Sequence, residues 1–234
     1  MDKINALRSA QRCDFLTVTT ISPEYYGGGF PPLPAHQLVA AAWCRVQFDE
    51  NQVTIDSVAL PLDQESTVLG WCHDHLVDKE LLILGTFYGN LFTLPLLCWK
   101  SVRYGTPMPI PEHRFDLADW TTFGFSEIKR FGISDCAEAM GLPKRFGTDL
   151  QARYFAQDFD SIQGFAETDL LIYCLVWLRF LLVAGLIKSK DFSAVGHNIM
   201  KSFYARTQTA KEYIKQTRHR EFLLLPPRKD PSNA

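Results

Sequence analysis

Although the sequence contains six cysteines, no two of them have the spacing Cys-x-x-Cys. Such pairs build most small zinc sites and dithiol redox motifs, so their absence argues against both. Most of the cysteines stand among apolar neighbours, as reduced, buried thiols do in a protein of a reducing compartment. We therefore expect a cytoplasmic protein that keeps these thiols in its core. They are Cys13, Cys44, Cys72, Cys98, Cys136 and Cys174.

The sequence also lacks the two common glycine-rich phosphate loops, GxGxxG and GxxxxGK[ST]. These loops place backbone N–H groups around the phosphates of a nucleotide, so neither a dinucleotide site nor a P-loop site is expected. The stretch YYGGG at 25–29 matches neither pattern, and we interpret it as an ordinary loop.

Long hydrophobic runs are scarce, and only LLIYCLVWLRFLLVAGLI (170–187) approaches the length of a membrane span. Arg179 lies near its middle, where a charge costs a few kcal/mol in lipid. A helix buried in a protein core explains this segment better. The first fourteen residues have no apolar stretch of signal-peptide length, so we expect neither secretion nor a membrane partner.

Charge is nearly balanced over the 234 residues, with a net of −2, but it is unevenly distributed. Residues 188–234 hold ten Lys/Arg against four Asp/Glu, whereas residues 1–187 hold fourteen against twenty-two. One interpretation is that the basic tail is the part of the protein that a polyanion would contact first. The other is that these charges form an ordinary solvated helix face. Phe203, Tyr204 and Tyr213 lie among these cations and either stack on bases or pack on the domain. The candidate nucleic-acid contacts are Lys201, Arg206, Lys211, Lys215, Arg218 and Arg220.

The order of the expected elements indicates an α/β protein. Strands are predicted at 14–22, 38–48, 52–60, 80–87 and 114–119, and the longer helices at 64–79, 91–105, 165–187 and 193–219. Three consecutive strands followed by alternating helices and strands favour a mixed sheet, in which an antiparallel meander continues into parallel strands and helices flank it. We expect one domain over 1–187 and a basic C-terminal helix and tail over 188–234.

Three segments in this order resemble one family of nucleases. GNLFTLPLL (89–97) is similar to Asn-Gly-Arg-x-Phe-Asp-Leu-Pro-x-Leu, and AMGLPKRFGTDLQARY (139–154) is similar to a Gly-Leu-Pro-x-Lys linker. FAETDLLIYCLVWLRF (165–180) resembles Tyr-Cys-Glu-Thr-Asp-Val-x-x-Thr-x-x-Leu-x-Leu-Arg. These motifs are those of predicted 3′–5′ exonucleases related to the proofreading domain of family-B DNA polymerases. The resemblance covers about residues 13–187 and implies a ribonuclease H-like fold.

In that family of DEDD nucleases, four carboxylates bind two divalent metals that activate a water and stabilise the leaving oxygen. A tyrosine four residues before the last aspartate orients the water. By the resemblance, Thr17, Thr19 and Thr93 stand where three of the four acids would be, and Phe165 replaces the tyrosine. Asp169 remains as the last aspartate. Because a neutral hydroxyl is a poor ligand for a hard cation, we expect no cofactor and no catalysis.

The residues leave a second interpretation of the site open. Other acids could rebuild it for Mg²⁺ or Mn²⁺, including Asp14 if the first motif slips in register. Otherwise Asp169 is expected to cap or charge the first turn of the long helix, beside Thr168. The possible replacement ligands are Glu24, Asp116, Asp119, Asp149 and Glu167.

The function expected from the sequence is therefore that of a pseudoenzyme. It would bind single-stranded or 3′-ended nucleic acid in DNA replication, repair, or mobile-element or phage biology. One alternative is a protein-interaction scaffold that docks on a replication or mobile-element protein. The other is an active, metal-dependent 3′–5′ exonuclease with a rebuilt site.

Overall fold

The protein is built on a five-stranded mixed sheet. The computed structural model describes residues 12–23, 30–48, 50, 52–78, 83–121, 132–144 and 149–217. The strands are β1 (Arg12–Ile21), β2 (Gln37–Gln47), β3 (Gln52–Ala59), β4 (Leu84–Thr86) and β5 (Arg114–Asp116). Their order is β3-β2-β1-β4-β5, with β1, β2 and β3 antiparallel and β1, β4 and β5 parallel. The expected α/β class, with an antiparallel meander continued by parallel strands, is confirmed.

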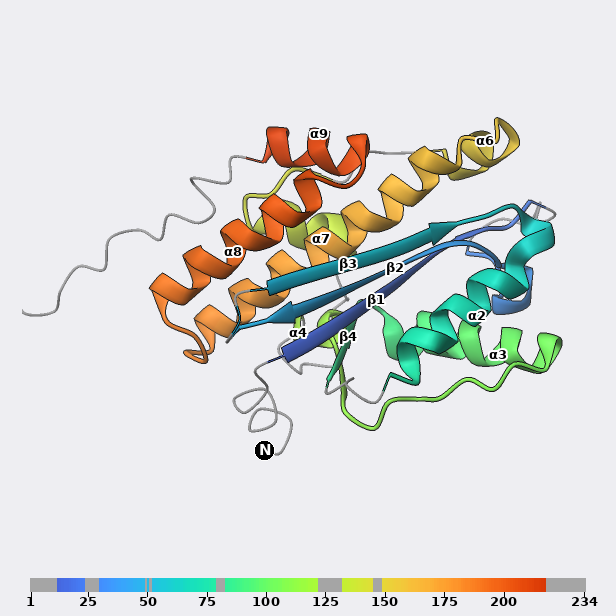
Figure 1. The fold of residues 1–234 in the computed structure, drawn as a ribbon, viewed down its shortest axis with the longest axis horizontal. Helices are drawn as coiled ribbons and strands as arrows, with labels where there is room; N and C mark the ends of the chain where they lie inside the picture. Colours follow the sequence, from blue (N-terminus) through green and yellow to red (C-terminus); the bar gives the residue numbers. More distant parts are fainter. Residues whose placement is uncertain are drawn as a thin grey trace, which may run out of the picture.

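Helices cover both faces of the sheet (Figure 1). The helices α2 (Glu65–Leu76) and α3 (Leu94–Tyr104) lie on one face. The other face carries α7 (Phe159–Val183), on which α8 (Ser189–Tyr204) and α9 (Gln208–Gln216) pack. The shorter elements are η1 (Leu33–Ala35), η2 (Leu62–Gln64), η3 (Gly89–Thr93), α4 (Leu117–Thr121), α5 (Ile133–Ala139) and α6 (Leu150–Phe155).

Strand β1 illustrates how the sequence builds these layers. Side chains alternate across a strand, so Cys13 and Phe15 join the core beneath α7, whereas Leu16 joins the core beneath α2 and α3. The neighbouring strand β4 contains Gly85, and a Cβ atom there would lie 2.6 Å from the rings of both Phe15 and Phe115. A glycine at this position therefore lets the Phe15 and Phe115 rings pack directly against the backbone of β4.

Helix α7 differs from its expected bounds and from the role expected for Asp169. It begins at Phe159 and ends at Val183, and the Asp158 side chain caps it by accepting a hydrogen bond from the Ser161 N–H. Asp169 therefore lies well inside the helix, so the prediction that it caps or charges the first turn is wrong. Among the helices that the structure describes, none combines the length and low polarity that a membrane span needs.

The expected C-terminal helix is instead two helices. The chain leaves the helical path after Tyr204, and Thr207 begins α9 by accepting a hydrogen bond from the Ala210 N–H. A threonine in this position is a common helix N-cap, because its hydroxyl satisfies a backbone N–H that has no helical partner. The break at Thr207 turns α9 back against α7.

Candidate functional site

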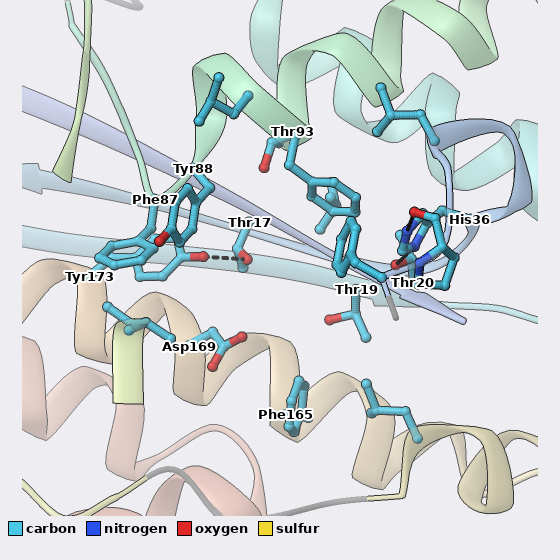
Figure 2. A pocket seen from close by; sticks show the side chains of 18 of the residues that line it. Thr17, Thr19, Thr20, His36, Phe87, Tyr88, Thr93, Phe165, Asp169 and Tyr173 are labelled. Atoms are coloured by element: carbon cyan, nitrogen blue, oxygen red, sulfur yellow. Dashed lines mark hydrogen bonds between the residues drawn. The ribbon is translucent and has the colours of Figure 1, made fainter. Parts of the chain in front are cut away.

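A pocket of about 760 Å³ lies between α7, the end of β1 and the η3 turn (Figure 2). Its wall includes all five positions that the sequence placed at the degenerate nuclease site. Three are neutral hydroxyls, one is an aromatic ring and one is a carboxylate. They are Thr17, Thr19, Thr93, Phe165 and Asp169.

Local periodicity explains how these positions meet. Thr17 and Thr19 are two residues apart on β1, so both point toward the α7 face of the sheet. Phe165 and Asp169 are four residues apart on α7, so they lie on one stripe of the helix. Thr93 ends η3, the turn that follows the short strand β4. Parallel pairing of β4 with β1 brings this turn alongside the two threonines.

Tyr173 is a pocket residue that the sequence analysis missed. Its hydroxyl shares a hydrogen bond of 3.2 Å with Thr17 Oγ1, although 156 residues separate them in the chain. The ring is 6% exposed and stacks on Phe87 with 5.8 Å between centroids. The signal that could have identified it is its position four residues after Asp169, on the same helical stripe.

The far end of the pocket is aromatic and uncharged. The rings of Phe30 and Phe92 each lie 4.9 Å from that of His36, centroid to centroid. His36 Nε2 donates to the Pro31 carbonyl at 3.1 Å, and its Nδ1 lies 2.9 Å from Thr20 Oγ1. Burial lowers the pKa of His36 from its ordinary value of 6.5, so the ring is neutral at pH 7.

The residues on this wall do not fit a pair of divalent metals. Hard cations such as Mg²⁺ bind several oxygen ligands, usually with carboxylates among them. Of the described residues, Asp169 alone places a carboxylate on the wall. In the same part of the chain, no group of three or more His, Cys, Asp or Glu side chains is arranged to hold a metal ion. The described wall thus lacks the donor set that a pair of divalent metals would need.

Two of the possible replacement acids are engaged elsewhere. Asp14 accepts a 2.6 Å hydrogen bond from Arg45 Nε and does not line the pocket. Asp116 accepts hydrogen bonds from the backbone N–H groups of Tyr88, Asn90 and Ala118. Burial raises the pKa of both carboxyls, although these hydrogen bonds partly offset it. Both acids therefore have structural partners in place of a metal.

Three of the remaining replacement acids, Asp119, Asp149 and Glu167, are described by the structure and also lie off the wall. Asp149 caps α6 by accepting from the Ala152 N–H, and Asp119 does not line the pocket. Glu167 accepts hydrogen bonds from other elements, as described next. Glu24 lies outside the described residues. Within the described part of the chain, the structure does not bring any of these acids to Asp169 to rebuild a metal site.

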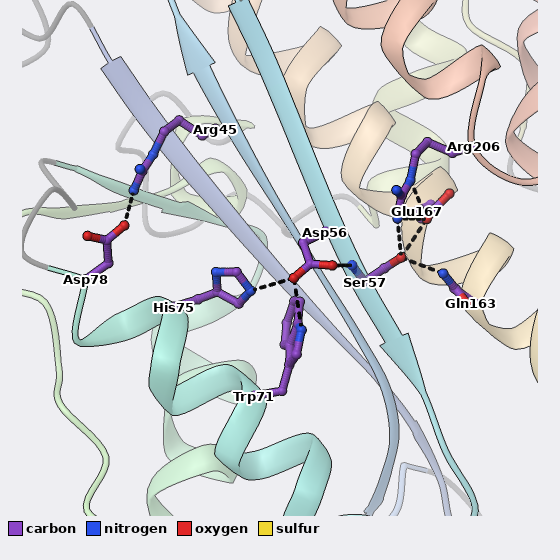
Figure 3. Close-up of polar contacts among 9 residues, drawn as sticks. All are labelled: Arg45, Asp56, Ser57, Trp71, His75, Asp78, Gln163, Glu167 and Arg206. Atoms are coloured by element: carbon purple, nitrogen blue, oxygen red, sulfur yellow. Dashed lines mark hydrogen bonds and ion pairs between the residues drawn. The ribbon is translucent and has the colours of Figure 1, made fainter.

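Arg206, one of the candidate nucleic-acid contacts, binds the protein itself (Figure 3). Its guanidinium lies 3.1 Å from Glu167 Oε1 and also donates to Ser57 Oγ at 3.1 Å. Ser57 in turn donates to Glu167 Oε1 at 2.6 Å and accepts from Gln163. Glu167 is fully buried, so Arg206 supplies the positive charge that a buried carboxylate needs. Arg206 thus connects the α8–α9 junction to α7 and β3.

The other basic candidates remain on the surface where the structure describes them. Lys201 and Lys215 are exposed, and the Lys211 ammonium lies 5.3 Å from the centre of the Tyr204 ring. Phe203 and Tyr213 are buried and therefore pack on the domain, which leaves Tyr204 as the exposed aromatic among the three. The candidates outside the described residues are Arg218 and Arg220.

Comparison with known proteins gives matches of two kinds. A family model described as "Predicted 3'-5' exonuclease related to the exonuclease domain of PolB" matches residues 110–221. The resemblance to this family that the motifs indicated is thus confirmed. A search of curated proteins gives no match.

Among solved structures, the chain is similar to the family B DNA polymerase from the hyperthermophilic archaeon Pyrobaculum calidifontis. The sequence identity is 16% and the TM-score is 0.47. The match covers 82% of this chain and 29% of the polymerase chain. This chain therefore spans less than a third of that polymerase.

Proposed function

We propose that this exonuclease-like protein holds the 3′ end of a single-stranded nucleic acid without cutting it and without a divalent metal. One observation carries the proposal. The five positions of the degenerate motifs converge on one pocket, where three of them are threonines and, among the described residues, Asp169 supplies the one carboxylate on the wall. The resemblance suggests a setting in DNA replication, repair, or mobile-element or phage biology, and the free cysteines suggest the cytoplasm.

Electrostatics supports the loss of catalysis. A pair of unit charges about 4 Å apart interacts by roughly 4 kcal/mol at an effective dielectric near 20, and a divalent ion doubles this for each carboxylate. Millimolar affinity needs only about 4 kcal/mol in total. Replacing three carboxylates by threonines therefore removes more than the affinity that would retain Mg²⁺ at cellular concentrations. Without the metals, no group on the described wall activates a water as the family does.

The same pocket supports retention of a ligand. Its volume is typical of a small-molecule site, and its wall combines hydroxyls with aromatic and aliphatic side chains. In an acidic site, carboxylates repel a phosphate and bound metals offset that repulsion. With threonines at these positions the repulsion is smaller, so a phosphate needs no metal to approach. Exposed cations on α8 and α9, such as Lys201 and Lys215, would attract the strand's backbone.

The catalytic part of the proposal is tested by incubating a 5′-labelled single-stranded oligonucleotide with the protein and Mn²⁺. We expect no ladder of shortened products, either for the wild type or for Asp169→Ala. A ladder that disappears in Asp169→Ala would show that a metal site is present and would overturn this part of the proposal.

The binding part is tested by fluorescence anisotropy of a labelled single strand in EDTA at two salt concentrations. Phe30 is 75% exposed and lines the pocket, so Phe30→Asp should weaken binding by placing a charge beside the strand. Val102→Asp is the matched control, because Val102 is 80% exposed on α3 and does not line the pocket. Absence of salt-sensitive binding by the wild type would contradict the proposal.

A second candidate function, a protein-interaction scaffold, has one observation in its favour. Leu91, Trp99 and Val102 on η3 and α3 are large apolar side chains with more than half of their surface exposed. Exposed aromatic and aliphatic groups of this kind are frequent at protein interfaces. A replication or mobile-element protein that co-purifies with the wild type but not with Trp99→Ser would favour this function.

A further inference from the structure

A tyrosine stands in this pocket where the resembled motif has a threonine. In Tyr-Cys-Glu-Thr-Asp-Val-x-x-Thr, the last threonine follows the aspartate by four residues. The corresponding segment here is FAETDLLIY, in which Tyr173 follows Asp169 by four. This exchange is separate from the loss of the acids, because it replaces a small hydroxyl side chain with a larger one and removes no carboxylate.

The Tyr173 hydroxyl is aimed at the first of the lost acidic positions. It lies 3.2 Å from Thr17 Oγ1, in the part of the pocket that also receives Asp169 (Figure 2). A metal held between residues 17 and 169 would bring ligand oxygens to about 2.0–2.1 Å from the ion. The phenol therefore competes for the space and for the oxygen that such a metal would use.

Packing fixes the tyrosine in this position. The residue is 6% exposed, and its ring stacks on Phe87 at an interplanar angle of 28°. A buried side chain in close-packed surroundings has few other rotamers available to it. An aspartate introduced at position 17 would meet the hydroxyl already in place and would accept a short, charge-assisted hydrogen bond from it.

We propose that Tyr173 excludes divalent metals from the pocket, so that restoring the three acids alone would not restore a metal site. The inference rests on the proposed function, in which the wild-type pocket binds no metal. It extends that function by assigning metal exclusion to a residue that is present, in addition to the acids that are lost. Tyr173 acts here through its contact with residue 17 and is a specificity-determining residue.

The experiment compares Mn²⁺ binding by two variants, measured from the electron paramagnetic resonance signal of the free ion. The first is Thr17→Asp/Thr19→Glu/Thr93→Asp. The second adds Tyr173→Thr to these three changes. Because a hydrogen bond to a charged group is worth a factor of about ten or more in an equilibrium constant, we expect the fourfold variant to bind Mn²⁺ at least about tenfold more tightly. Wild type and Tyr173→Thr alone are the controls and should show no binding.

Equal Mn²⁺ affinity of the two variants, whether measurable or absent, would overturn the role of Tyr173. Circular dichroism melting establishes that each variant is folded. If the fourfold variant does not fold, Tyr173→Phe replaces Tyr173→Thr, since it removes the hydroxyl and keeps the ring. No gain from that change would also overturn the inference. Oligonucleotide binding by the wild type, measured on the same preparation, tests the proposed function separately.

Discussion

At the scale of single residues, Thr17 and Thr19 fit a β-strand well but are poor ligands for a divalent metal. β-Branched side chains fit a half-buried, pleated strand, so both positions keep β1 intact. Their hydroxyls are neutral and cannot provide the charge that holds a divalent ion. Thr17 also finds a hydrogen-bond partner in Tyr173. Threonine at these positions therefore gives the pocket neutral hydroxyls and fits the strand.

His36 leads to a prediction about pH. Burial lowers its pKa below the ordinary value of 6.5, so between these two values the unfolded chain binds a proton that the folded protein does not. Its contribution to stability is present above pH 6.5 and is lost as the pH falls through the folded-state pKa. We expect the melting temperature to fall between pH 7.5 and pH 5.5, and to fall less in His36→Phe. That variant keeps the ring contacts with Phe30 and Phe92 and cannot titrate.

The measurement is the difference in melting temperature between the two pH values, because the lost hydrogen bonds to Thr20 and Pro31 change the absolute stability of the variant. His197→Phe is the control, since His197 is exposed. An equal loss of melting temperature in wild type and His36→Phe would contradict the prediction.

At the scale of elements, α7 organises the half of the molecule that contains the pocket. One stripe carries Phe165, Asp169 and Tyr173 to the pocket wall. Other faces of the same helix contact α8 and α9, and every residue from Gly164 to Leu178 is buried. Such a helix is apolar on all sides because protein surrounds it, which explains why its sequence resembles a membrane span.

The contact between α7 and α9 depends on a glycine. A Cβ atom on Gly164 would lie 2.7 Å from both Cβ and Oγ1 of Thr209, closer than packed atoms approach. We expect Gly164→Ala to displace α9 and to lower the free energy of unfolding by about 1–3 kcal/mol, as overpacking does. The measurement is urea unfolding followed by circular dichroism.

Gly70→Ala is the matched control for this prediction. Gly70 lies inside α2, and a Cβ atom there would have no neighbour within 4 Å. Alanine should therefore stabilise that helix by up to about 1 kcal/mol, since it has the higher helix propensity. If Gly164→Ala is as stable as Gly70→Ala, then α9 is not held by close packing at this point.

At the scale of the whole molecule, an acidic body carries a basic C-terminal segment. Residues 188–234 contribute ten Lys/Arg against four Asp/Glu. The structure divides these cations by role, because Arg206 serves an internal ion pair while Lys201 and Lys215 face solvent. Only the second kind is available to attract a polyanion over a distance.

We expect Lys211→Glu/Lys215→Glu to weaken oligonucleotide binding and to flatten its dependence on salt. Each lost phosphate contact reduces the slope of log K against log salt by about one. Lys188→Glu/Lys190→Glu changes the net charge equally at the exposed start of α8 and is the control. If both double variants lose the same affinity, total charge governs binding and α9 is not the contact.

Sequence periodicity determined which residues share a face, and therefore much of the pocket. Alternation along β1 places Thr17 with Thr19, and the helical repeat places Phe165 with Asp169. The order of strands and helices indicated the mixed sheet, and the motif departures predicted which positions carry threonine where the resembled family has an acid. These properties are local, so a single sequence contains them.

Tertiary structure alone decided the partners. The sequence around Tyr173 does not show that its hydroxyl contacts Thr17. The sequence around Arg206 does not show that its guanidinium pairs with Glu167. The role expected for Asp169 was wrong because α7 extends further toward the N-terminus, where Asp158 caps it. The first two contacts join groups that are distant in the sequence and that packing brings together. The role of Asp169 depends on where α7 begins. Such contacts follow from the arrangement of the whole chain, because burial and hydrogen-bond satisfaction select them among many local alternatives.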